Sequence, residues 1–518
     1  PVFPFPEVPM PHRSLLFDLY TDGVLDAAFL SSFRPEPLGP EAREIVDAFR
    51  ALSERFPPEE LEARGRVPEE ALAEMGRIGL FGMSLPREHG GLGLLFGQYL
   101  GVVAEMAPVD LALALTSLAH LSIGVQPVVL FGTEEQKARF LGPAARGETI
   151  FAYALTEPDV GSDARHIRTS CRLSDDGRHY VLRGQKTYIT NANYAGAFTV
   201  FAQLEGHRPG HMVALVVERD SEGFTVGRDM AKMGLKASST AFLRFEDVRV
   251  PVENRLGDEG QGFRIAMSVL SYGRLAVCAA GVGLMEASAE AMAKRAASRV
   301  QFGGPIGRFE LVREKIGRAR ANAFVGRAMV ELAARQLEED PRANVAVETS
   351  HCKLFCTTRA WEALYDAQQV AGGSGYLATN PYEKRLRDFR VATIFEGTTE
   401  IHTIYPPLVV ARGLGRRLPK RTGGRVGALL SGIFRRLPAF PVTGVGQADR
   451  ALRLARRKAR GFAWRIRAAL LRHGKAIAGR EFLLRRLTWT SLYGYGLLAG
   501  ALRLAALARA GGDTAGAA

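Results

Sequence analysis

The stretch FAYALTEPDVGSD, Phe151–Asp163, lies where a helical pattern gives way to a β pattern, and this boundary decides the fold. Upstream, over about residues 41–150, apolar residues recur three and four positions apart, as in EAREIVDAFRALSERF. Downstream, to about residue 262, β-forming runs such as YVLRGQKTYIT, HMVALVVER and TAFLRFEDVRV alternate with Gly and Asp turns. The sequence therefore predicts a helical domain followed by a β domain of barrel or sandwich size.

Long helical patterns return after the β region and reach the length of bundle helices, up to Val370. A glycine-rich run, GGLGLLFG, follows no β-strand, so it lacks the context of a dinucleotide-binding loop. The chain is thus predicted to be a multidomain α+β protein without a Rossmann domain. We expect an N-terminal extension at 1–40, a helical domain at 41–150, a β domain at 151–262, a helical bundle at 263–413, a basic linker at 414–449 and an extra helical domain at 450–518.

Positive charge is concentrated at the C-terminal end. The whole chain of 518 residues carries a net charge of +14, yet residues from Ala411 onward contain 23 Lys and Arg against 3 acidic residues. Such an asymmetry predicts a polyanionic partner for the tail alone.

Cysteine content and the length of apolar runs argue against a disulfide-rich, metal-binding, secreted or transmembrane protein. Four irregularly spaced cysteines do not form a disulfide framework, and a metal cluster at His351, Cys352 and Cys356 is less expected than buried cysteines in a helix. The Pro-rich segment at residues 1–13 lacks the pattern of a signal peptide. Charged residues and glycines interrupt the apolar runs before about 20 residues, so we expect no transmembrane helix and no bound metal.

Six motifs occur in one order over residues 40–412. They are TEPDVGSD (156–163), GQKTYITN (184–191), LGDEGQGF (256–263), SRVQFGGPIG (298–307), QQVAGGSGY (368–376) and RDFRVATIFEGTTEI (387–401). Together they resemble the acyl-CoA dehydrogenase family. The later segment HGKAIAGREFLLRRLTWTSLYGYGLL resembles the extra C-terminal domain of the very-long-chain branch. The resemblance implies an N-terminal helical domain, a middle β domain and a C-terminal four-helix bundle, plus an additional helical domain.

The resemblance also implies FAD as the cofactor. Donors at Leu155 and Thr156 would stabilise the negative charge of the reduced flavin ring, and Thr190 would reach flavin N5. Tyr188 stands where the family commonly has tryptophan. Taken alone, TEPDVGSD is as consistent with an ordinary turn between strands. The expected cofactor-binding residues are Tyr153, Leu155, Thr156, Gly161, Ser162, Tyr188, Ile189, Thr190, Arg299, Gln301, Phe302, Gln369, Val370, Gly372, Gly373, Thr398 and Glu400.

By the same resemblance, the cofactor bridges two chains. Arg299 and Gln301 would contact the pyrophosphate of the FAD held by a neighbouring subunit, and the run Gln369–Gly373 would approach the adenosine half. Glycines allow close approach to phosphates, and arginine supplies a planar charged group. Binding of FAD would then require an oligomer. The resemblance also implies that the extra C-terminal domain covers the surface through which shorter relatives pair two dimers, so we expect a homodimer. Without a partner, Arg299 would be an ordinary solvated arginine.

Glu396, within IFEGTTEI, is the candidate catalytic base. Removal of a weakly acidic α-proton needs a carboxylate together with donors to the thioester carbonyl. The apolar neighbours of Glu396 predict a raised pKa. One branch of the family carries its base on the helix that here holds SYGR, where this chain has Gly273. Arg274 would order the Glu396 loop or the region of the substrate carbonyl, unless it forms a plain interhelical salt bridge. The expected substrate-binding residues are Ser162, Leu115, Ala119, Ser271, Arg274, Phe395 and Gly397.

The resemblance implies the β-oxidation reaction that forms trans-2-enoyl-CoA from long or very long fatty acyl-CoA, with an electron-transferring flavoprotein as acceptor. Leu115 and Ala119 would form a small apolar end to the acyl pocket, unless they simply pack against a neighbouring helix. Alternatives are a scaffold for respiratory-complex assembly, a DNA-binding relative and an oxidase using oxygen. Retention of Glu396 and Arg274 favours catalysis, and the tail lacks a nucleic-acid reading motif.

The basic tail predicts a peripheral membrane contact. Residues 424–440, GRVGALLSGIFRRLPAF, and residues 450–475 mix Arg and Lys with apolar residues, as helices lying in a headgroup layer do. The alternative is that Leu452, Leu454, Phe462 and Ile466 form a core beneath a solvated basic face. We expect a cytoplasmic protein at the inner face of the membrane, or the equivalent in the mitochondrial matrix for a eukaryotic chain.

Overall fold

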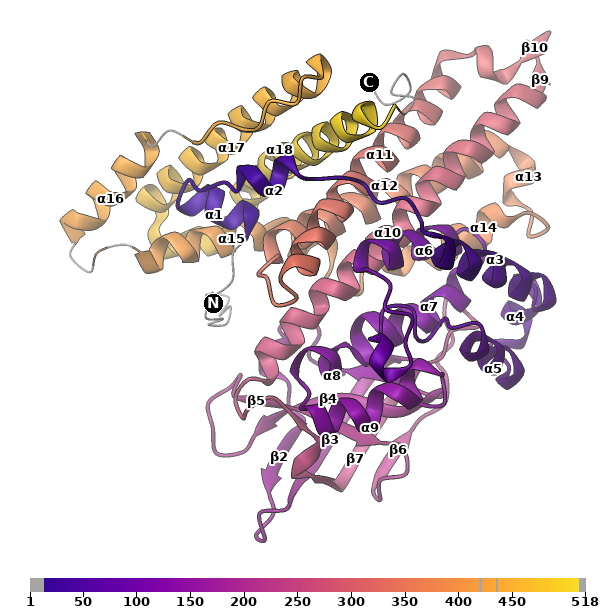
Figure 1. Ribbon diagram of the computed structural model, residues 1–518, viewed down its shortest axis with the longest axis vertical. Helices are drawn as coiled ribbons and strands as arrows, with labels where there is room; N and C mark the ends of the chain where they lie inside the picture. The colour runs from indigo at the N-terminus through magenta and orange to yellow at the C-terminus, as the bar shows by residue number, and fades with distance from the viewer. Residues whose placement is uncertain (1–13, 418, 420–421, 435–436, 512–518) are drawn as a thin grey trace.

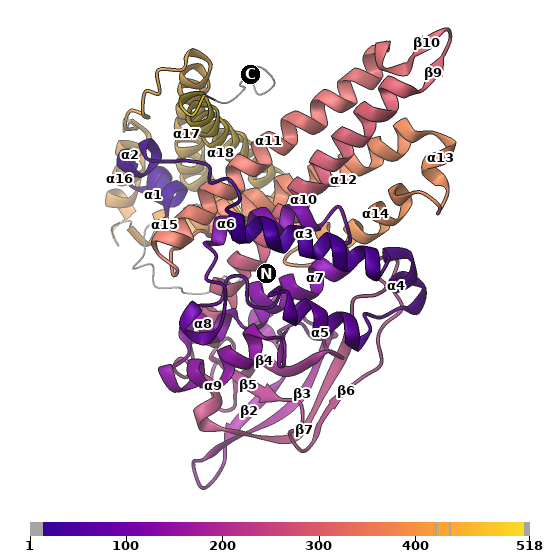
Figure 2. The same ribbon diagram turned by 45° about the vertical axis from the view of Figure 1, so that its right-hand side comes forward.

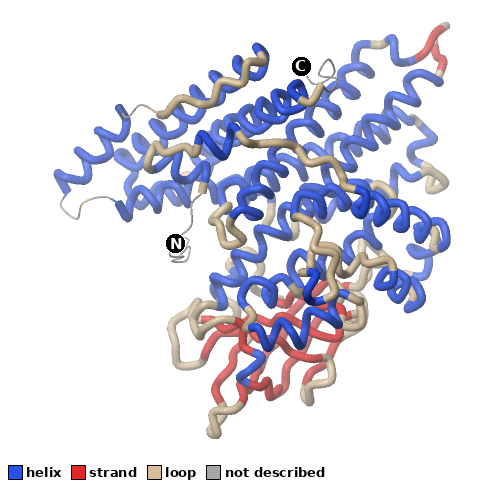
Figure 3. The backbone as a smooth tube through the Cα atoms, in the orientation of Figure 1, coloured by secondary structure: helices blue, strands red, loops and turns tan. Residues whose placement is uncertain are grey.

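A computed structural model describes residues 14–417, 419, 422–434 and 437–511. Figure 1 shows a β-sheet region at the bottom, a long helical bundle crossing the molecule, and a group of basic helices beside the bundle. Figure 3 shows that strands are confined to this lower region and to one hairpin at the far end of the bundle. The predicted multidomain α+β fold is confirmed.

The helices before the sheet carry clear start signals. The Asp110 side chain caps α7 by accepting from the N–H groups of Ala112 and Leu113, and Thr133 with Gln136 forms a capping box on α9. Their bounds are α3 Pro40–Arg55, α4 Pro58–Arg64, α5 Glu69–Arg77, α6 Phe96–Met106, α7 Leu111–Ala119, a π-helical turn η2 His120–Gly124, α8 Gln126–Phe131 and α9 Glu134–Ala145.

The sheet has the order β6-β7-β3-β2-β4-β5-β8, and β1 pairs in parallel with β4. Its bounds are β1 Ile150–Ala154, β2 Ser170–Leu173, β3 His179–Thr190, β4 Ala195–Leu204, β5 Met212–Glu218, β6 Phe224–Val226, β7 Thr240–Pro251 and β8 Arg255–Leu256. The register of β3 against β7 shifts between Lys186 and Ile189, and Tyr188 there adopts a φ of 58°. This bulge turns the Tyr188 side chain out of the sheet's alternation.

The bundle is built on α10 Gly262–Ser298, α11 Glu310–Glu339, α12 Ala346–Ala371 and α15 Thr399–Arg417. The hairpin of β9 Val300–Gln301 and β10 Gly304–Pro305 joins α10 to α11. Short helices α13 Gly373–Tyr376 and α14 Pro381–Phe389 and the turn η6 Arg390–Thr393 lead from α12 to the loop before α15. Figures 1 and 2 both place the β9–β10 hairpin and α13 at the end of the bundle away from the sheet.

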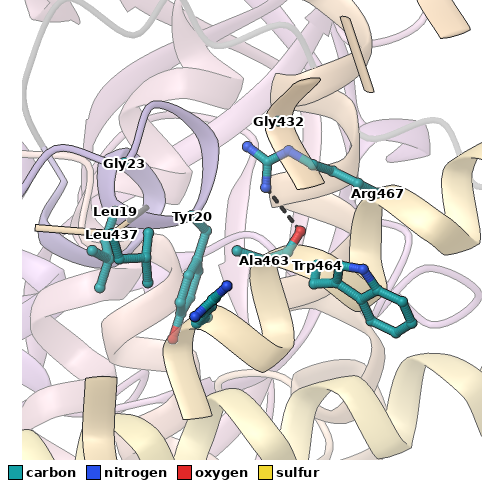
Figure 4. Close-up of a pocket in the computed structure, with 9 residues that line it drawn as sticks. Leu19, Tyr20, Gly23, Gly432, Leu437, Ala463, Trp464 and Arg467 are labelled. Carbon is teal, nitrogen blue, oxygen red and sulfur yellow. Dashed lines mark hydrogen bonds between the residues drawn. The ribbon is translucent and has the colours of Figure 1, made fainter. Parts of the chain in front are cut away.

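The basic region contains α16 Thr422–Phe434, α17 Gly446–His473 and α18 Glu481–Arg509, so α16 lies in the segment expected as a linker. The segment before residue 40 forms α1 Leu15–Thr21 and α2 Ala27–Ser31, and α1 contacts α17, α15 and α12. Figure 4 shows the small cavity between α1 and α17, where Arg467 donates to Ala463 O and, at 2.8 Å, to Thr21 O. The N-terminal helix α1 therefore packs against the basic helix α17 near the other end of the described chain.

The burial of residues in α17 shows whether its apolar side chains form a core or an exposed apolar surface. Leu452, Phe462 and Ile466 are buried, Leu454 is half-buried, and Trp464 keeps 49% of its surface exposed. The apolar residues of α17 are therefore mainly core, and its arginines other than the buried Arg467 form the outer face.

Three helical stretches are long and apolar enough to cross a membrane: Leu111–Phe131, α10 and α18. The expectation that no stretch reaches this length and composition was wrong. Their apolar windows are 89%, 83% and 67% buried inside the protein, respectively. A helix that is apolar all round is also what a large helical core needs.

Candidate active site

Glu396 lies in the loop between η6 and α15, in an uncommon backbone conformation. Its φ is 56°, and the φ of Gly397 is 95°. A non-glycine residue in the left-handed region costs about 1–3 kcal/mol unless its surroundings impose the conformation. The surroundings here must therefore hold this loop.

Three side chains from three helices hold the loop by its carbonyl groups. Arg274 Nε of α10 and His402 Nε2 of α15 lie 3.3 Å and 3.0 Å from Glu396 O, and Lys353 Nζ of α12 donates to Gly397 O at 2.8 Å. A carbonyl oxygen can only accept, so His402 carries its proton on Nε2 and its Nδ1 accepts from the Ser350 hydroxyl at 3.0 Å. Arg274 therefore contacts the backbone of the Glu396 loop.

The Glu396 carboxylate has no hydrogen bond to the residues that the structure describes. The residue keeps some exposure, but its Oε2 atom is buried and contacts no donor among the described residues. A Cβ atom at position 273 would lie 3.0 Å from Glu396 Oε1 and 2.6 Å from Ile123 Cγ2. Gly273 therefore leaves the space that the carboxylate occupies, and no second base fits there.

The electrostatics suit a base that works near neutral pH. Burial raises the pKa of Glu396 to about 7, against the opposing effect of the Arg274 and Lys353 cations. A carboxylate with this pKa is ionised in a large fraction of molecules at neutral pH and still binds a proton strongly.

The predicted flavin-ring residues lie at the ends of β1 and β3. Lys186 Nζ donates to Leu155 O at 3.1 Å and pairs with Glu157 at 2.8 Å, while Thr187 N donates to Thr156 O at 2.9 Å. These contacts fix the loop after β1. The Ile189 side chain points into the sheet core, so any contact it makes with a cofactor is through its backbone.

Two glycines and two aromatic residues among the predicted cofactor-binding residues have open space around them that no packing among the described residues explains. An added Cβ at Gly161 or Gly373 would meet no atom within 4 Å, and neither backbone is left-handed. Tyr188 and Phe302 are 66% and 88% exposed on left-handed backbones. Open glycines and unpacked aromatic rings fit a large flat cofactor with a phosphate arm.

One chain does not bring all the predicted cofactor residues together. Arg299, Gln301 and Phe302 lie at the β9–β10 hairpin, and Gln369–Gly373 lie at the nearby end of α12, with Val370 half-buried and Gln369, Gly372 and Gly373 exposed. Figures 1 and 2 show the β9–β10 hairpin and α13, which follows Gly372, far from the sheet. Leu155 directly follows β1 of that sheet, and Thr190 is the last residue of β3. The candidate cofactor site is therefore in two halves.

The remaining predicted site residues differ in their burial. Ser271, Leu115 and Ala119 are buried, at 6%, 7% and 4% exposed, and the Thr398 hydroxyl accepts from the N–H of Ile401 at the start of α15. Tyr153, Thr156, Thr190, Phe395 and Gly397 are half-buried, whereas Ser162, Arg299 and Glu400 are exposed.

Sequence reasoning missed Lys353, His402 and Ile123. His402 follows Glu396 by six residues and could have been noticed on that ground, but nothing local separates Lys353 from a surface lysine. Nearby, Cys352 and Cys356 are buried and His351 Nε2 bonds Ser491 Oγ at 2.8 Å. Within the described ranges no three His, Cys, Asp or Glu side chains are grouped as metal ligands.

Comparisons with known proteins show the class to which this helical and β fold belongs. Family models described as the N-terminal, middle and C-terminal domains of acyl-CoA dehydrogenase match residues 39–148, 152–248 and 260–405. The chain belongs to the acyl-CoA dehydrogenase family, as its motifs predicted, and is an enzyme of that family.

Similar proteins include both long and short members. The human mitochondrial very long-chain specific acyl-CoA dehydrogenase is 35% identical over 467 residues, covering 86% of this chain and 71% of that protein. An acyl-CoA dehydrogenase of Bacillus subtilis is 36% identical over 364 residues, covering 70% of this chain and 95% of its own length. The shorter relative thus has no counterpart for much of this chain.

Solved structures give the same result. An acyl-CoA dehydrogenase from Bacillus anthracis complexed with FAD has a TM-score of 0.82 and 30% identity, covering 95% of this chain and 88% of its own. Butyryl-CoA dehydrogenase from Megasphaera elsdenii has a TM-score of 0.68 and 32% identity, covering 74% and 100%. Members of the family bind FAD, in agreement with the cofactor predicted from the motifs.

Proposed function

We propose that this protein oxidises long or very long fatty acyl-CoA to trans-2-enoyl-CoA with FAD as cofactor and Glu396 as base. The observation that carries the proposal is the Glu396 carboxylate, whose buried Oε2 atom has no hydrogen-bond donor among the described residues and whose Oε1 atom lies against Gly273. A structural carboxylate at such a site would be expected to have a partner.

Glu396 removes the α-proton of the thioester. Its raised pKa lets it hold that proton, and the backbone N–H of Glu396 donates to the thioester carbonyl, where negative charge develops. When bound, FAD supplies the oxidising power and accepts the hydride from the β-carbon. Gly397 has no side chain that could obstruct the thioester.

Two chains would share each cofactor. Tyr153, Leu155, Thr156, Tyr188 and Thr190 of one chain would hold the flavin ring. The hairpin residues Arg299, Gln301 and Phe302, with Gln369–Gly373, would reach the phosphate and adenosine parts from a second copy. The separation of these halves in one chain supports a homodimer.

Preference for long acyl chains rests on two observations. Leu115 and Ala119 are small or aliphatic and line up on α7, and each buried methylene of a substrate contributes about 0.8 kcal/mol. The match to very long-chain specific relatives also extends over most of the chain, including part of the basic region. An electron-transferring flavoprotein would be the acceptor.

A peripheral membrane contact would bring the enzyme to its lipid substrate. Val426 and Leu430 of α16 are 45% and 44% exposed beside a strongly basic region. Each basic residue near an anionic surface contributes about 1 kcal/mol. We place the protein at the inner face of a membrane, the equivalent of the mitochondrial location named for its relatives.

Anaerobic titration with palmitoyl-CoA tests the proposal. We expect the purified protein to carry about one non-covalent FAD per chain, and palmitoyl-CoA to bleach its absorbance. A comparison of kcat/KM for butanoyl-, octanoyl- and palmitoyl-CoA then tests the chain length. A maximum at butanoyl-CoA would refute the long-chain assignment, and a flavin that no acyl-CoA reduces would refute the activity.

A further inference from the structure

Lys353 is a buried cation that the reaction as proposed does not use. Its side chain is fully buried in α12, and its one recorded hydrogen bond joins Nζ to Gly397 O at 2.8 Å. No carboxylate of the described residues lies within ion-pair distance of it. Lys186, which is equally buried, instead pairs with Glu157. Because an unpaired buried cation is costly, its retention calls for a reason other than stability.

The contact of the Lys353 ammonium group with the Glu396 loop gives that reason. Glu396 and Gly397 are both left-handed, and their two consecutive carbonyls face donors from the surrounding helices. Arg274 and His402 share the first carbonyl, whereas Lys353 alone donates to the second. The Glu396 carbonyl belongs to the 396–397 peptide and the Gly397 carbonyl to the 397–398 peptide, so the three donors hold two successive peptide planes. With both planes held, the backbone angles of Gly397 between them cannot change freely, and the backbone that carries the Glu396 side chain keeps its direction.

We infer that Lys353 is a positioning residue of the reaction: by holding the Gly397 carbonyl, its ammonium group fixes the 397–398 peptide next to the 396–397 peptide that Arg274 and His402 hold, and the loop so fixed aims the Glu396 carboxylate over Gly273. This inference rests on the proposed role of Glu396 as the base. Lys353 does not contact the reacting atoms. It acts through the backbone of the loop and through its charge.

The charge has a second effect on the same carboxylate. The titratable and charged groups that act on Lys353 or Glu396 are Arg274 and Cys278 of α10, Tyr153 of β1, and Glu400 and His402 of α15. Burial lowers the pKa of His402 well below its usual range, so this ring is neutral. Burial also lowers the pKa of Lys353, to about 8, which leaves it a cation at neutral pH. Arg274 and Lys353 are thus the two cations that favour ionised Glu396.

Removal of the Lys353 charge should therefore raise the pKa of Glu396. With one cation gone, the pKa of Glu396 rises and a smaller fraction of it is ionised at a given pH. The rate of flavin reduction, which requires the ionised base, then reaches half its maximum at a higher pH. A lysine that only stabilised the fold would leave this midpoint unchanged.

The test is single-turnover reduction of the FAD-loaded holoenzyme by palmitoyl-CoA, measured anaerobically by stopped flow between pH 6 and 9. We expect Lys353→Met to retain FAD and bind palmitoyl-CoA, to reduce flavin at least about tenfold more slowly, and to shift the midpoint upward by about half a pH unit or more. Lys353→Arg keeps the charge but moves the donor, so we expect a slower rate with a smaller shift of the midpoint.

Thr357→Val is the matched control. Thr357 is buried one turn further along α12, and its hydroxyl bonds only the Lys353 carbonyl within the helix. It should reduce flavin at the rate and midpoint of the unmodified enzyme. If Lys353→Met does not fold, Lys353→Gln, which keeps a donor without the charge, takes its place.

A variant without the charge that is less stable yet has an unaltered reduction rate and midpoint would overturn the inference. Glu396→Gln is measured in parallel to separate this inference from the proposed function. If Glu396→Gln reduces flavin normally, the assignment of the base is wrong and the role of Lys353 falls with it. If Glu396→Gln is inactive while the Lys353 variants behave normally, only the inference about Lys353 is wrong.

Discussion

The position of Glu396 is determined by its backbone, which frees its carboxylate for chemistry. Arg274 and His402 hold its carbonyl oxygen, while Oε2 accepts no hydrogen bond from the described residues. A base stabilised by donors to its side chain would have a depressed pKa and would bind a proton weakly. Donors that hold the main chain instead fix the position of Glu396 without a hydrogen bond to that carboxylate oxygen.

Replacement of Glu396 by Gln should abolish turnover while preserving binding. The amide matches the carboxylate in shape but cannot take a proton, and loss of a positioned base costs about 10²–10⁴-fold in rate or more. We expect unchanged FAD content and a spectral response to palmitoyl-CoA binding, with kcat reduced at least about a thousandfold.

Glu362→Gln serves as the control for this substitution. Glu362 is partly exposed on α12 and pairs with Arg359, away from the catalytic loop. Normal kcat in Glu396→Gln would place the base elsewhere.

Sequence reasoning singled out the candidate base and Arg274 beside it, but missed the other residues that hold the loop. Glu396, Arg274 and the glycines near the flavin motifs are visible because they lie in recognisable local patterns. Lys353 lies 43 positions before Glu396 in an amphipathic helix, where a lysine usually reaches solvent. Its contact with Gly397 depends on how α12 packs against the loop, and this information is tertiary.

At the scale of elements, α12 connects the catalytic loop to both ends of the chain. Lys353 faces the loop, Glu348 accepts from Leu16 N at 2.7 Å, and His351 bonds Ser491 of α18. Helix periodicity predicted α12 as a long helix, but it could not reveal that its buried polar residues face three different partners. The boundaries of the basic region were also hard to predict, because α16 begins after a break rich in Arg, Gly and Pro.

Glu348→Gln should flatten the dependence of stability on pH. Burial raises the pKa of Glu348 to about 7 from its ordinary 4.5, so the folded state binds more protons than the unfolded state between these values. The free energy of unfolding therefore falls as pH rises from about 4.5 to 7. Glutamine retains an acceptor for Leu16 N and cannot titrate.

Thermal denaturation at pH 5.5 and pH 8 measures this effect. We expect the difference in Tm between the two pH values to be smaller in Glu348→Gln than in the unmodified protein, and unaltered in Glu222→Gln, an exposed control on the β domain. An equal difference in all three would mean that Glu348 does not contribute.

The helix α16 should mediate membrane binding through its apolar surface. Val426→Asp with Leu430→Asp places two carboxylates on exposed positions of α16 and opposes both apolar insertion and attraction to anionic lipid. In co-sedimentation with anionic vesicles at physiological salt, we expect at least about a tenfold loss of affinity, since two charges each oppose binding by about 1 kcal/mol.

Leu95→Asp is the control, because Leu95 is 49% exposed but lies before α6 in the N-terminal domain. Equal vesicle binding by the double variant and the control would contradict a role for α16, as would a lack of binding by the intact protein.

At the scale of the whole molecule, each active site requires two copies of the chain if the proposed division of the cofactor site is correct. Arg299→Glu damages the hairpin half, and Glu396→Gln damages the catalytic half. When the two inactive variants are unfolded, mixed and refolded with FAD, half the dimers are hybrids, and each hybrid has one site with both halves intact. We expect recovery of about a quarter of the sites.

Activity after mixing is measured with palmitoyl-CoA and an artificial electron acceptor. Each variant refolded alone is the control and should remain inactive. Failure of the mixture to regain activity, with dimers present by size-exclusion chromatography, would show that one chain supplies both halves.

The contact between Tyr20 and Ser491 spans 471 positions of sequence and has a consequence for synthesis in the cell. The ribosome releases α12 long before α18, so the face of α12 that carries His351 stays uncovered while more than a hundred further residues are made. Such a surface can associate wrongly with other nascent chains. Production of this enzyme should therefore depend on chaperones until its last helix has emerged and closed over the bundle.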